Sequence, residues 1–565
     1  MKSIKTFAIA ALSTIALLSS CGRKEQTAVY YNAKVYTADH NMSEASAFVV
    51  KDDKIAFVGN DADAIAFAGK KAQQSDMQGA RIIPGMCDTH CHYFAMSTLT
   101  SGAKSLQLAE KETHEQTMDR IREFVTANPE LEIITGNGWG WNCNILASEL
   151  DKVESKRPIL LMSCDGHTAW CNTALLQKLG VDKNFKDIAP GQSYFERDAD
   201  GNPNGRIVET AQCYWVSQTL GNRNEQHVKA GMPSLSAFFN SVGVTTIYDA
   251  GPLSIADSIA LKGASMVPDN SLRIFASIYY NGTESDEQFV ARAKRLREQY
   301  SSDLLRPNTF KAFKDGTIEV ATAYTSDSHP FKNPPYRRAG HGICLFSTEQ
   351  LLRITQKVAA EGFNIHIHAI GDRAIDEVLD VMAGLGDIPG TKTIAHCQVL
   401  SEKVLPKFIA NKDVFYQTTP VWMANDHNFE ANFGKEMYRK WDMPVKSVLD
   451  GGITLTFGSD GPASSGTYGM NPMNNIWACL NQGKDPGLNN RPEQNLTVAQ
   501  CIDAYTINAA RQFGAADEFG SISVGKSADF VVLDRDIFSI DTADVKNTKV
   551  TRTYLKGKCV YTLAE

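Results

Sequence analysis

Strand-like apolar runs alternate with amphipathic helical stretches through the middle of this 565-residue chain, and this alternation constrains the fold more than any other feature. The strand-like runs are short, and amphipathic stretches at residues 349–361 and 372–385 lie between them. Strands separated by helices predict an α/β fold with a parallel sheet. The clearest strand-like runs are residues 244–248, 363–368, 393–396 and 453–457.

A pair of histidines, His90 and His92, closes the motif Pro-Gly-Met-Cys-Asp-Thr-His-Cys-His of residues 84–92. The motif follows the apolar residues 80–83 and is predicted to be a strand. Alternate side chains of a strand point to the same face, so both imidazoles face one side. Two converging imidazoles suit a borderline-soft divalent metal. A histidine pair of this kind also occurs on ordinary surfaces and in cores.

Further strand-like runs also end in metal-compatible side chains. In a parallel barrel the carboxyl ends of the strands carry the chemistry, so these groups are expected to meet at one rim. Agreement between several strand ends arises by chance much less often than a single histidine pair. The runs contribute, in chain order, Lys311, His366 with His368, His396, and Asp460.

The two ends of the chain are predicted to form one small β-sandwich domain. Short strand-like runs with turns fill residues 29–83, and residues 528–533 and 550–558 are strand-like at the other end. A segment at about 100–240 is too long for bare loop and is predicted to be an inserted, partly helical lobe over the barrel mouth. We assign residues 22–83 with 520–565 to the small domain, and residues 84–519, including the lobe, to the barrel.

The first 21 residues are predicted to be a lipoprotein signal peptide. Lys2 and Lys5 precede a short apolar stretch at residues 6–18, and Cys21 then follows in a sequence that resembles a bacterial lipobox. Lipidation of the Cys21 thiol would anchor the protein durably. Gly22, rather than aspartate, after Cys21 resembles the signal that sorts enterobacterial lipoproteins to the outer membrane. We expect a bacterial envelope protein that faces the periplasm and touches the membrane only through this anchor. An ordinary cleaved signal peptide is the alternative.

Charge, hydropathy and cysteine spacing argue against a nucleic-acid-binding protein, a membrane-spanning protein and a disulfide-rich protein. The net charge is −7, and no basic stretch is long enough to indicate nucleic-acid binding. No run after the leader is long and apolar enough to span a membrane. The 12 cysteines show no close-set pattern, so buried free thiols are expected at Cys87, Cys91 and Cys397. Pairing stays open among Cys143, Cys164, Cys171 and Cys213.

These motifs together resemble the metal-dependent amidohydrolase superfamily, in the branch that contains the N-substituted formamide deformylases. The resemblance covers essentially the whole chain after the leader, and the segments at residues 503–510 and 520–529 are specific to the superfamily. It implies a (β/α)8 TIM-type barrel, a small β-sandwich domain from both chain ends and a lobe inserted after strand 1. The other matching motifs are residues 84–92, 165–172, 310–316, 368–373 and 459–462, with His396.

The superfamily implies a role for each metal-compatible residue. Lys311 resembles the bridging lysine, whose amine becomes a carbamate, and Asp460 resembles the aspartate that binds metal and shuttles protons. The histidine-rich set favours two zinc ions bridged by carboxylated Lys311; a single metal, iron and manganese are the alternatives. The implied ligands are His90, His92, Lys311, His368, His396 and Asp460, and Asp460 is the implied catalytic residue.

Two of these ligand assignments have an alternative residue nearby in the sequence. His366 shares the strand face of His368, which is preferred because the family's Ala-Ile-Gly-Asp-Arg follows it. Lys314 is the rival of Lys311, but the two lysines have opposite strand phases. Ala395 stands where the family usually has a glutamate before the strand-6 histidine. A contact that this glutamate would make to support the metal ligands is therefore in doubt, whereas His396 itself remains an expected ligand.

Three residues of the predicted lobe are candidates for substrate contacts. His167 lies in the motif Asp-Gly-His-Thr-Ala-Trp-Cys-Asn of residues 165–172, and its alternative role is a local cap. Trp139 and Trp170 are expected to line a pocket for an apolar or aromatic substituent. Packing inside the lobe is the alternative for both tryptophans.

The expected reaction is hydrolysis of a carbon–nitrogen bond in a small amide, formamide or cyclic amide by attack of a metal-bound hydroxide. Asp460 would move the proton from the water to the leaving nitrogen. The same barrel also supports deaminases, decarboxylases and isomerases, and a non-catalytic ligand-binding envelope lipoprotein is a further alternative. The complete ligand set argues against loss of catalysis. The sequence leaves a homo-oligomer open.

Overall fold

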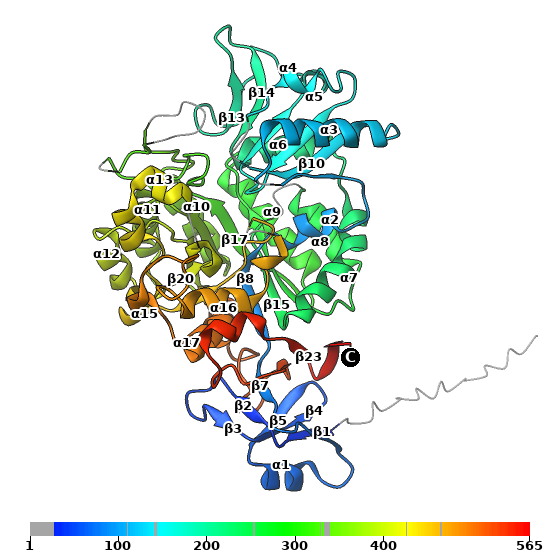
Figure 1. Ribbon diagram of the computed structural model, residues 1–565, viewed down its shortest axis with the longest axis vertical. Coiled ribbons are helices and arrows are strands. Elements are labelled where there is room, and N and C mark those ends of the chain that lie inside the picture. The colour runs from blue at the N-terminus through cyan, green and yellow to red at the C-terminus, as the bar shows by residue number, and fades with distance from the viewer. Residues whose placement is uncertain are drawn as a thin grey trace, which may run out of the picture.

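The computed structural model shows a central barrel between a small sheet domain at one end and a lobe at the other (Figure 1). The predicted leader with Cys21 lies outside the described residues. No helix within the described residues is long and apolar enough to cross a membrane. The described residues are 27–109, 111–140, 144–251, 255–327, 329–332, 340–424, 427–463 and 466–564.

The barrel consists of eight parallel strands, and its first and last strands, β8 and β21, contact each other. This arrangement confirms the predicted (β/α)8 barrel. All eight strands are buried along their described lengths except at scattered positions, so each is flanked on both faces, as a parallel barrel requires. In sheet order the strands are β8 (Met86–Cys91), β15 (Val244–Asp249), β16 (Arg273–Tyr279), β17 (Leu305–Phe313), β18 (Asn364–Ala369), β19 (Lys392–His396), β20 (Val414–Thr418) and β21 (Leu455–Phe457).

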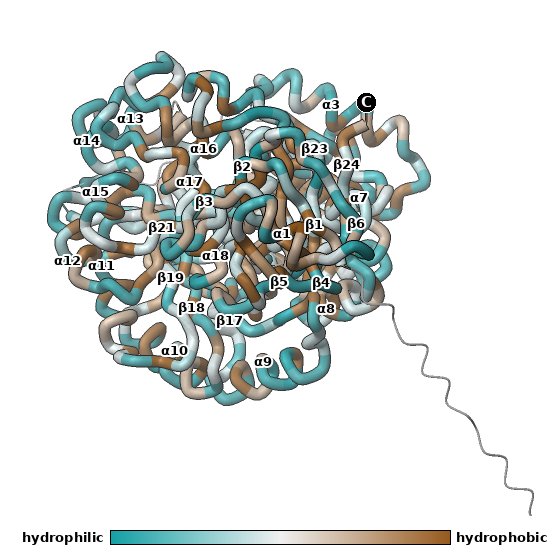
Figure 2. The backbone as a smooth tube through the Cα atoms, turned by 90° about the horizontal axis from the view of Figure 1, so that it is seen from below, coloured by the Kyte–Doolittle hydropathy of each residue, from teal (hydrophilic) through white to brown (hydrophobic). Residues whose placement is uncertain are grey.

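Helices surround this barrel, as the view from below shows (Figure 2). In α10, Leu351, Ile354 and Val358 are buried at spacings of three and four residues, and each such side chain contributes roughly 1.5–3 kcal/mol. The helix begins at Ser347, whose hydroxyl caps the backbone N–H of Gln350. The helices are α2 (Tyr93–Leu99), α7 (Glu225–Ser241), α8 (Asp257–Ser265), α9 (Asp286–Tyr300), α10 (Thr348–Ala360), α11 (Asp372–Gly384), α12 (Val404–Ala410), α13 (His427–Phe433), α14 (Lys435–Trp441), α15 (Val445–Asp450), α16 (Pro472–Leu480), α17 (Val498–Tyr505) and α18 (Ile507–Gln512).

The small domain is built from both ends of the chain, as predicted. Strand β7 leads into the barrel and pairs antiparallel with β22 from the far end, with Ile83 opposite Val531. Stacked rings of Phe530 and Tyr554, 4.2 Å apart, lie in its core. One sheet has the order β5 (Lys54–Gly59), β4 (Ala47–Lys51), β1 (Thr27–Tyr31), β6 (Gln73–Asp76); the other has β24 (Lys558–Thr562), β23 (Val550–Leu555), β22 (Phe530–Leu533), β7 (Arg81–Pro84), β2 (Lys34–Tyr36), β3 (Glu44–Ala45).

The lobe follows strand 1 of the barrel and contains a mixed six-stranded sheet with helices packed on it. In Figure 1 it lies above the carboxyl ends of the barrel strands, opposite the small domain. Its helices include α3 (His114–Ala127), α5 (Thr173–Leu179) and α6 (Thr210–Leu220). In sheet order its strands are β13 (Tyr194–Arg197), β14 (Pro203–Val208), β12 (Thr168–Cys171), β11 (Ile159–Ser163), β10 (Ile134–Trp139) and β9 (Leu106–Gln107).

The buried cysteines within the described residues are free thiols. Cys87, Cys91 and Cys397 are buried among the barrel strands, in agreement with the sequence analysis. Burial raises the pKa of Cys91 and Cys397 well above the ordinary value, so these thiols stay protonated. Among the cysteines whose pairing stayed open, Cys171 and Cys213 are free thiols, and Cys143 lies outside the described residues.

Candidate metal centre

Side chains from separate barrel strands meet at the carboxyl ends of those strands. The possible ligand atoms of His90, His396 and Asp460 all lie within 4.8 Å of one another, and all three residues are buried. These residues come from the first, sixth and eighth strands or from the turn that follows. Each member of this trio also contacts one of the remaining predicted ligands, His92, Lys311 and His368.

Hydrogen bonds fix the orientation of the two histidines at the end of β8. Nδ1 of His92 lies 2.8 Å from the carbonyl oxygen of Gly251. A carbonyl only accepts, so Nδ1 carries the proton and Nε2 carries the lone pair. Nδ1 of His90 lies 2.9 Å from Nε2 of His366, and either nitrogen can donate this hydrogen bond. Both Nε2 atoms face Oδ1 of Asp460, at 3.3 Å from His92 and 3.4 Å from His90.

Several electron-rich atoms of this cluster are buried without a hydrogen-bond donor. Oδ1 of Asp460, Nδ1 of His368 and Nδ1 of His396 have no hydrogen-bond partner within the described part of the chain. Each such atom costs about 1–3 kcal/mol when it is left unpaired in the interior. Imidazole nitrogens with a carboxylate are ligands that a divalent metal such as Zn²⁺ takes. The residues present thus fit a divalent metal.

The protonation states also suit metal binding. Burial, reinforced by the charge of Lys311, holds the pKa of His90 well below its ordinary value. Burial lowers the pKa of His396 to about 3, although Asp460 opposes this shift. Burial raises the pKa of Asp460, but the neighbouring imidazoles of His92 and His396 outweigh it, so the net shift is downward. Neutral imidazoles beside an ionised carboxylate are the forms that bind metals.

Lys311 and Lys314 point in opposite directions, as their strand phases predict. Nζ of Lys311 is buried 3.5 Å from Nε2 of His90. Burial lowers the pKa of Lys311 to about 7, although nearby carboxylates oppose this shift. Lys314 instead forms an ion pair with Glu377 on helix α11. Lys311 is thus the lysine at the cluster, and its lowered pKa favours the neutral amine.

His366 and His368, which competed for one role, make different contacts. The ring of His368 lies 4.5 Å from the ring of His396. Its Nε2 lies 3.1 Å from the carbonyl oxygen of Gly316, so Nε2 carries the proton and Nδ1 keeps a free lone pair. Nε2 of His366 is already engaged by His90. The geometry favours His368 as a ligand and gives His366 a supporting position.

The backbone is strained at two of the strand ends. His396 has φ +73° and Asp460 has φ +48°, in the left-handed region that residues other than glycine rarely adopt. Strain of this kind clusters at functional sites. Gly458, just before Asp460, permits a close approach of the chain: a Cβ there would lie 2.4 Å from the backbone nitrogen of His90.

Buried acids hold the loops beneath the cluster. Asp88 accepts hydrogen bonds from the backbone N–H groups of His90, at 3.1 Å, and Ser459, at 2.9 Å. Asp315 accepts three backbone N–H bonds from the loops after β17 and β18. Burial raises the pKa of Asp88 to about 6 and of Asp315 to about 7. The sequence analysis gave Asp315 no role, although it follows a strand directly.

His167 is the predicted lobe residue that reaches the cluster. Its ring lies 5.4 Å from the ring of His368, and its Nδ1 lies 2.8 Å from Oε2 of Glu209. Burial lowers the pKa of His167, but the charge and hydrogen bond of Glu209 outweigh it and raise the value to about 9. The sequence analysis missed Glu209, which lies in no recognised motif and has φ +65°.

Trp139 and Trp170 lie in the core of the lobe. Their rings stack 3.8 Å apart at an angle of 10°, and both side chains are fully buried. Nε1 of Trp139 donates to the carbonyl oxygen of Leu161 at 2.8 Å. They pack with other apolar lobe residues such as Ile121 and Leu150. Their position supports the packing role, and the prediction that they contact substrate gains no support.

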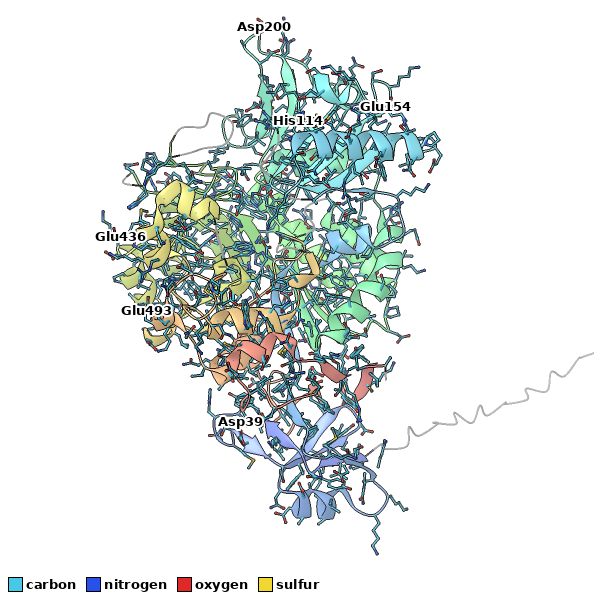
Figure 3. The ribbon with its side chains drawn as sticks, viewed as in Figure 1. Asp39, His114, Glu154, Asp200, Glu436 and Glu493 are labelled. Atoms are coloured by element: carbon cyan, nitrogen blue, oxygen red, sulfur yellow. The ribbon has the colours of Figure 1, made fainter. Side chains whose placement is uncertain are left out.

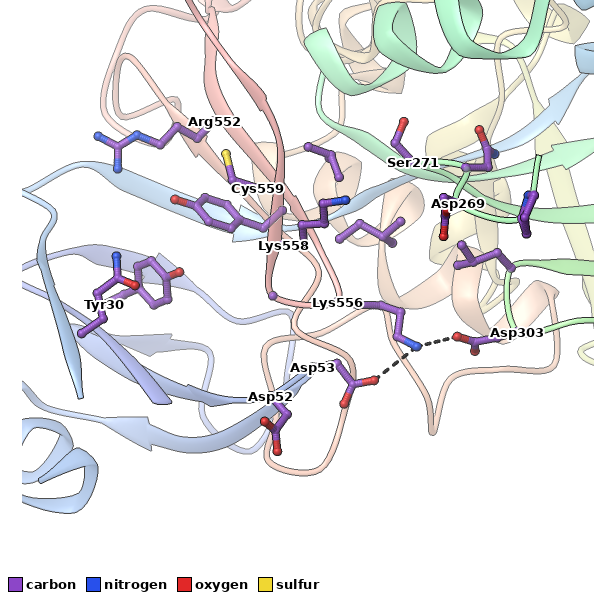
Figure 4. Close-up of a pocket in the computed structure, with 18 of the residues that line it drawn as sticks. Tyr30, Asp52, Asp53, Asp269, Ser271, Asp303, Arg552, Lys556, Lys558 and Cys559 are labelled. Atoms are coloured by element: carbon purple, nitrogen blue, oxygen red, sulfur yellow. Dashed lines mark hydrogen bonds and ion pairs between the residues drawn. The ribbon is translucent and has the colours of Figure 1, made fainter. Parts of the chain in front are cut away.

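Other candidate features lie away from the cluster. His114, which had no supporting context in the sequence, lies on the lobe (Figure 3), where Nε2 is 2.9 Å from Oε1 of Glu149. A cavity of about 1200 Å³ lies between the small domain and the amino-terminal end of the barrel (Figure 4). Lys556 bridges Asp53 of the small domain and Asp303 of the barrel there. This cavity is at the opposite end of the barrel from the histidines.

A parallel barrel whose strand ends converge on a buried imidazole–carboxylate cluster has the architecture of a metal-dependent barrel hydrolase. The profile described as "Amidohydrolase family" matches residues 73–561, and the chain belongs to this family.

Relatives of the chain carry several different names. It is 30% identical over 427 residues to the exoenzymes regulatory protein AepA of Pectobacterium carotovorum subsp. carotovorum, covering 73% of this chain and 89% of that protein. It is 26% identical over 562 residues to the N-substituted formamide deformylase of Arthrobacter pascens, covering 94% and 97%. An uncharacterized metal-dependent hydrolase from Pyrococcus horikoshii OT3 shares the fold, with a TM-score of 0.69 and 22% identity over 92% of this chain and 99% of that chain.

Proposed function

We propose that this member of the amidohydrolase family hydrolyses a carbon–nitrogen bond in a small amide-like molecule with the help of a divalent metal. One observation carries the proposal: buried Oδ1 of Asp460 has no hydrogen-bond partner among the described residues and lies 3.3 Å from Nε2 of His92, whose Nδ1 proton is used by the carbonyl of Gly251. A purely structural polar cluster pairs each acceptor with a donor. Facing acceptors instead call for a cation.

Six residues would hold the metal, with zinc as the default ion because nitrogen donors dominate and thiolates are missing from the set. When bound, a divalent metal polarises the scissile carbonyl and lowers the pKa of water toward about 7. Two ions bridged by Lys311 are proposed. The proposed ligands are His90, His92, Lys311, His368, His396 and Asp460.

Asp460 is proposed to move the proton during hydrolysis. Its lowered pKa keeps the carboxylate ionised at neutral pH, so it can accept a proton from the attacking water. It would then donate that proton to the leaving nitrogen, which departs far more readily as an amine than as an anion. Its position beside His90 and His92 supports a role in both transfers.

Lys311 is proposed to carry a carbamate. A neutral amine attacks the carbon of carbon dioxide, forms a nitrogen–carbon bond and releases a proton. The pKa of about 7 supports this step, because an ammonium group has no lone pair with which to attack. The product replaces a positive charge with a negative one, which suits two neighbouring cations.

A metal analysis followed by a hydrolysis panel tests this function. Purified protein is analysed for zinc, iron and manganese, then assayed on N-substituted formamides, cyclic imides and N-acyl amino acids. We expect release of free amine or acid from one class, loss of turnover after chelation, and recovery when metal returns. Metal without turnover of any panel member would favour a ligand-binding function. As a control, His114→Ala removes a partly exposed lobe histidine and should change neither metal content nor turnover.

We further propose that Cys21 carries a lipid anchor in the cell envelope. The lipobox-like sequence before it supports this assignment. Expression in a bacterial host with labelled palmitate tests it: label is expected in the wild-type protein and not in Cys21→Ser. Label in neither protein, with cleavage at another position, would indicate an ordinary signal peptide.

A further inference from the structure

The lobe supplies one hydrogen-bonded acid–imidazole pair to the metal centre. His167 precedes β12, Glu209 precedes α6, and Nδ1 of His167 lies 2.8 Å from Oε2 of Glu209. Both side chains are buried, with 4% of His167 and none of Glu209 exposed. The carboxylate accepts, so Nδ1 carries a proton. No described residue makes a hydrogen bond to Nε2, the other nitrogen of this ring.

The backbone conformation of Glu209 and the burial of its carboxylate both cost free energy. Its φ of +65° lies in a region that side chains other than glycine rarely adopt. Its Oε1 is buried without a hydrogen-bond partner in the part of the chain that the structure describes. Gly316, after β17, makes room for it, since a Cβ there would lie 2.2 Å from Oε1. Packing alone gives no reason to keep a strained, half-satisfied carboxylate at this position.

Two hydrogen bonds between the lobe and the barrel, with a third inside the lobe, fix His167 at the same rim of the barrel. Oγ1 of Thr317, after β17, donates to Oδ2 of Asp165 at 2.9 Å. Oδ1 of Asp165 accepts the backbone N–H of His167 at 3.0 Å. Thr210, the first residue of α6, lies 3.3 Å from the hydroxyl of Tyr279 at the end of β16. The imidazole is therefore fixed relative to the barrel by contacts on both sides.

We propose that Glu209 is a positioning residue for His167, and that His167 binds the scissile end of the substrate through Nε2. This inference rests on the hydrolase function proposed above. The ring of His167 lies 5.4 Å from the ring of His368, a proposed metal ligand, so a molecule held at the metal centre lies beside this imidazole. The barrel thus supplies the metal ligands, and the lobe completes the site from above.

A double-mutant cycle with His167→Gln and Glu209→Gln tests the inference on the metal-loaded, full-length enzyme. Each single variant should lower kcat/KM by about 10- to 100-fold, as expected for loss of one or two substrate hydrogen bonds. Metal content should stay unchanged in both. Glu209 acts only through His167, so the double variant should be no worse than His167→Gln. Losses that multiply in the double variant would overturn the positioning role.

Asp187→Asn is the matched control, because Asp187 is a mostly buried lobe acid that pairs with Arg197 at 2.7 Å. It should lower the stability of the lobe and leave kcat/KM unchanged. An equal loss of kcat/KM in Asp187→Asn and Glu209→Gln would show that Glu209 only stabilises the lobe, and would overturn the proposal.

Proton NMR tests the pair even if no panel amide is hydrolysed, an outcome that would count against the hydrolase function alone. A low-field imidazole N–H signal is expected in the wild type and in Asp187→Asn. It should be missing from His167→Gln and Glu209→Gln. A wild-type spectrum without this signal, or a signal that survives in Glu209→Gln, would overturn the pair itself.

Discussion

The carboxylate of Asp460 lies 3.3 Å from Nε2 of His92 and joins the last strand of the barrel to the first. The same seam carries a hydrogen bond of 2.6 Å from the backbone N–H of Asp460 to the carbonyl oxygen of His90. Asp88 adds a further bond by accepting the backbone N–H of Ser459. The contacts that close the barrel between its first and last strands are thus also contacts of the candidate metal centre.

Asp460→Asn should abolish proton transfer and leave the shape of the site intact. An amide cannot take up a proton at neutral pH, so kcat is expected to fall by about 10²- to 10⁴-fold. The histidines should still hold metal. Turnover of the panel substrate and metal content by mass spectrometry are measured together. Full activity in this variant would rule out the proton-transfer role.

Lys311→Ala should lower metal occupancy, because it removes the proposed anionic bridge. Acetate or propionate fits the space left by the side chain and is expected to restore part of the metal and part of the activity. Metal content is measured by mass spectrometry before and after addition of the acid. Unchanged metal content in the variant would point to a centre that does not use a lysine carbamate.

Lys314→Met provides the control for Lys311, since Lys314 is also fully buried and lies at the end of the same strand. It loses the ion pair with Glu377 and keeps most of the aliphatic volume. We expect the free energy of unfolding to fall by about 1–3 kcal/mol with the metal content unchanged. Equal metal loss in both variants would mean that strand β17, rather than the Lys311 amine, controls occupancy.

The lowered pKa of Lys311 predicts that the free energy of unfolding of the metal-free protein depends on pH. It falls from an ordinary 10.5 to about 7 in the folded state because the amine is buried. The unfolded chain therefore binds more protons between these values, and stability should rise with pH over this window. Metal-free wild type should be less stable than Lys311→Met at pH 7, and the difference should narrow toward pH 10. Urea unfolding measures this; a constant difference would contradict the shift.

The sequence predicted the barrel well because its signals are local. Residues 363–368 and 393–396 are β18 (Asn364–Ala369) and β19 (Lys392–His396) within one or two residues, since buried parallel strands read as continuous apolar runs. The six-stranded sheet of the lobe was not predicted. Its strand β12 pairs with β11 and β14, and pairing between separated segments leaves no local pattern.

Part of the candidate cluster could be predicted from the same local signals, as the proximity of His90, His396 and Asp460 shows. Histidines at strand ends converge because parallel strands share one rim. The contact of His167 with Glu209 depends on how the lobe packs on the barrel, which no local pattern encodes. Trp139 and Trp170 suited a pocket or a core equally well, and only their mutual stacking in the lobe core distinguishes the two.

Gly458→Ala should weaken the barrel seam and the metal centre together. The new Cβ would lie 2.4 Å from the backbone nitrogen of His90 and 2.8 Å from its Cβ, closer than atoms tolerate. Relief of this contact must move His90 relative to Asp460. We expect a loss of about 1–3 kcal/mol in unfolding free energy and weaker zinc binding, measured by competition with a chelating dye.

Gly390→Ala separates these two effects. Its Cβ would lie 2.6 Å from the carbonyl oxygen of Phe363, a comparable clash near the start of β18 and β19, at the opposite end of the barrel from the cluster. Its unfolding free energy should fall by a similar amount, whereas its zinc affinity should match the wild type. Equal zinc affinity in both glycine variants would show that the metal centre tolerates displacement of the seam, and that His90 is not held in place by Gly458.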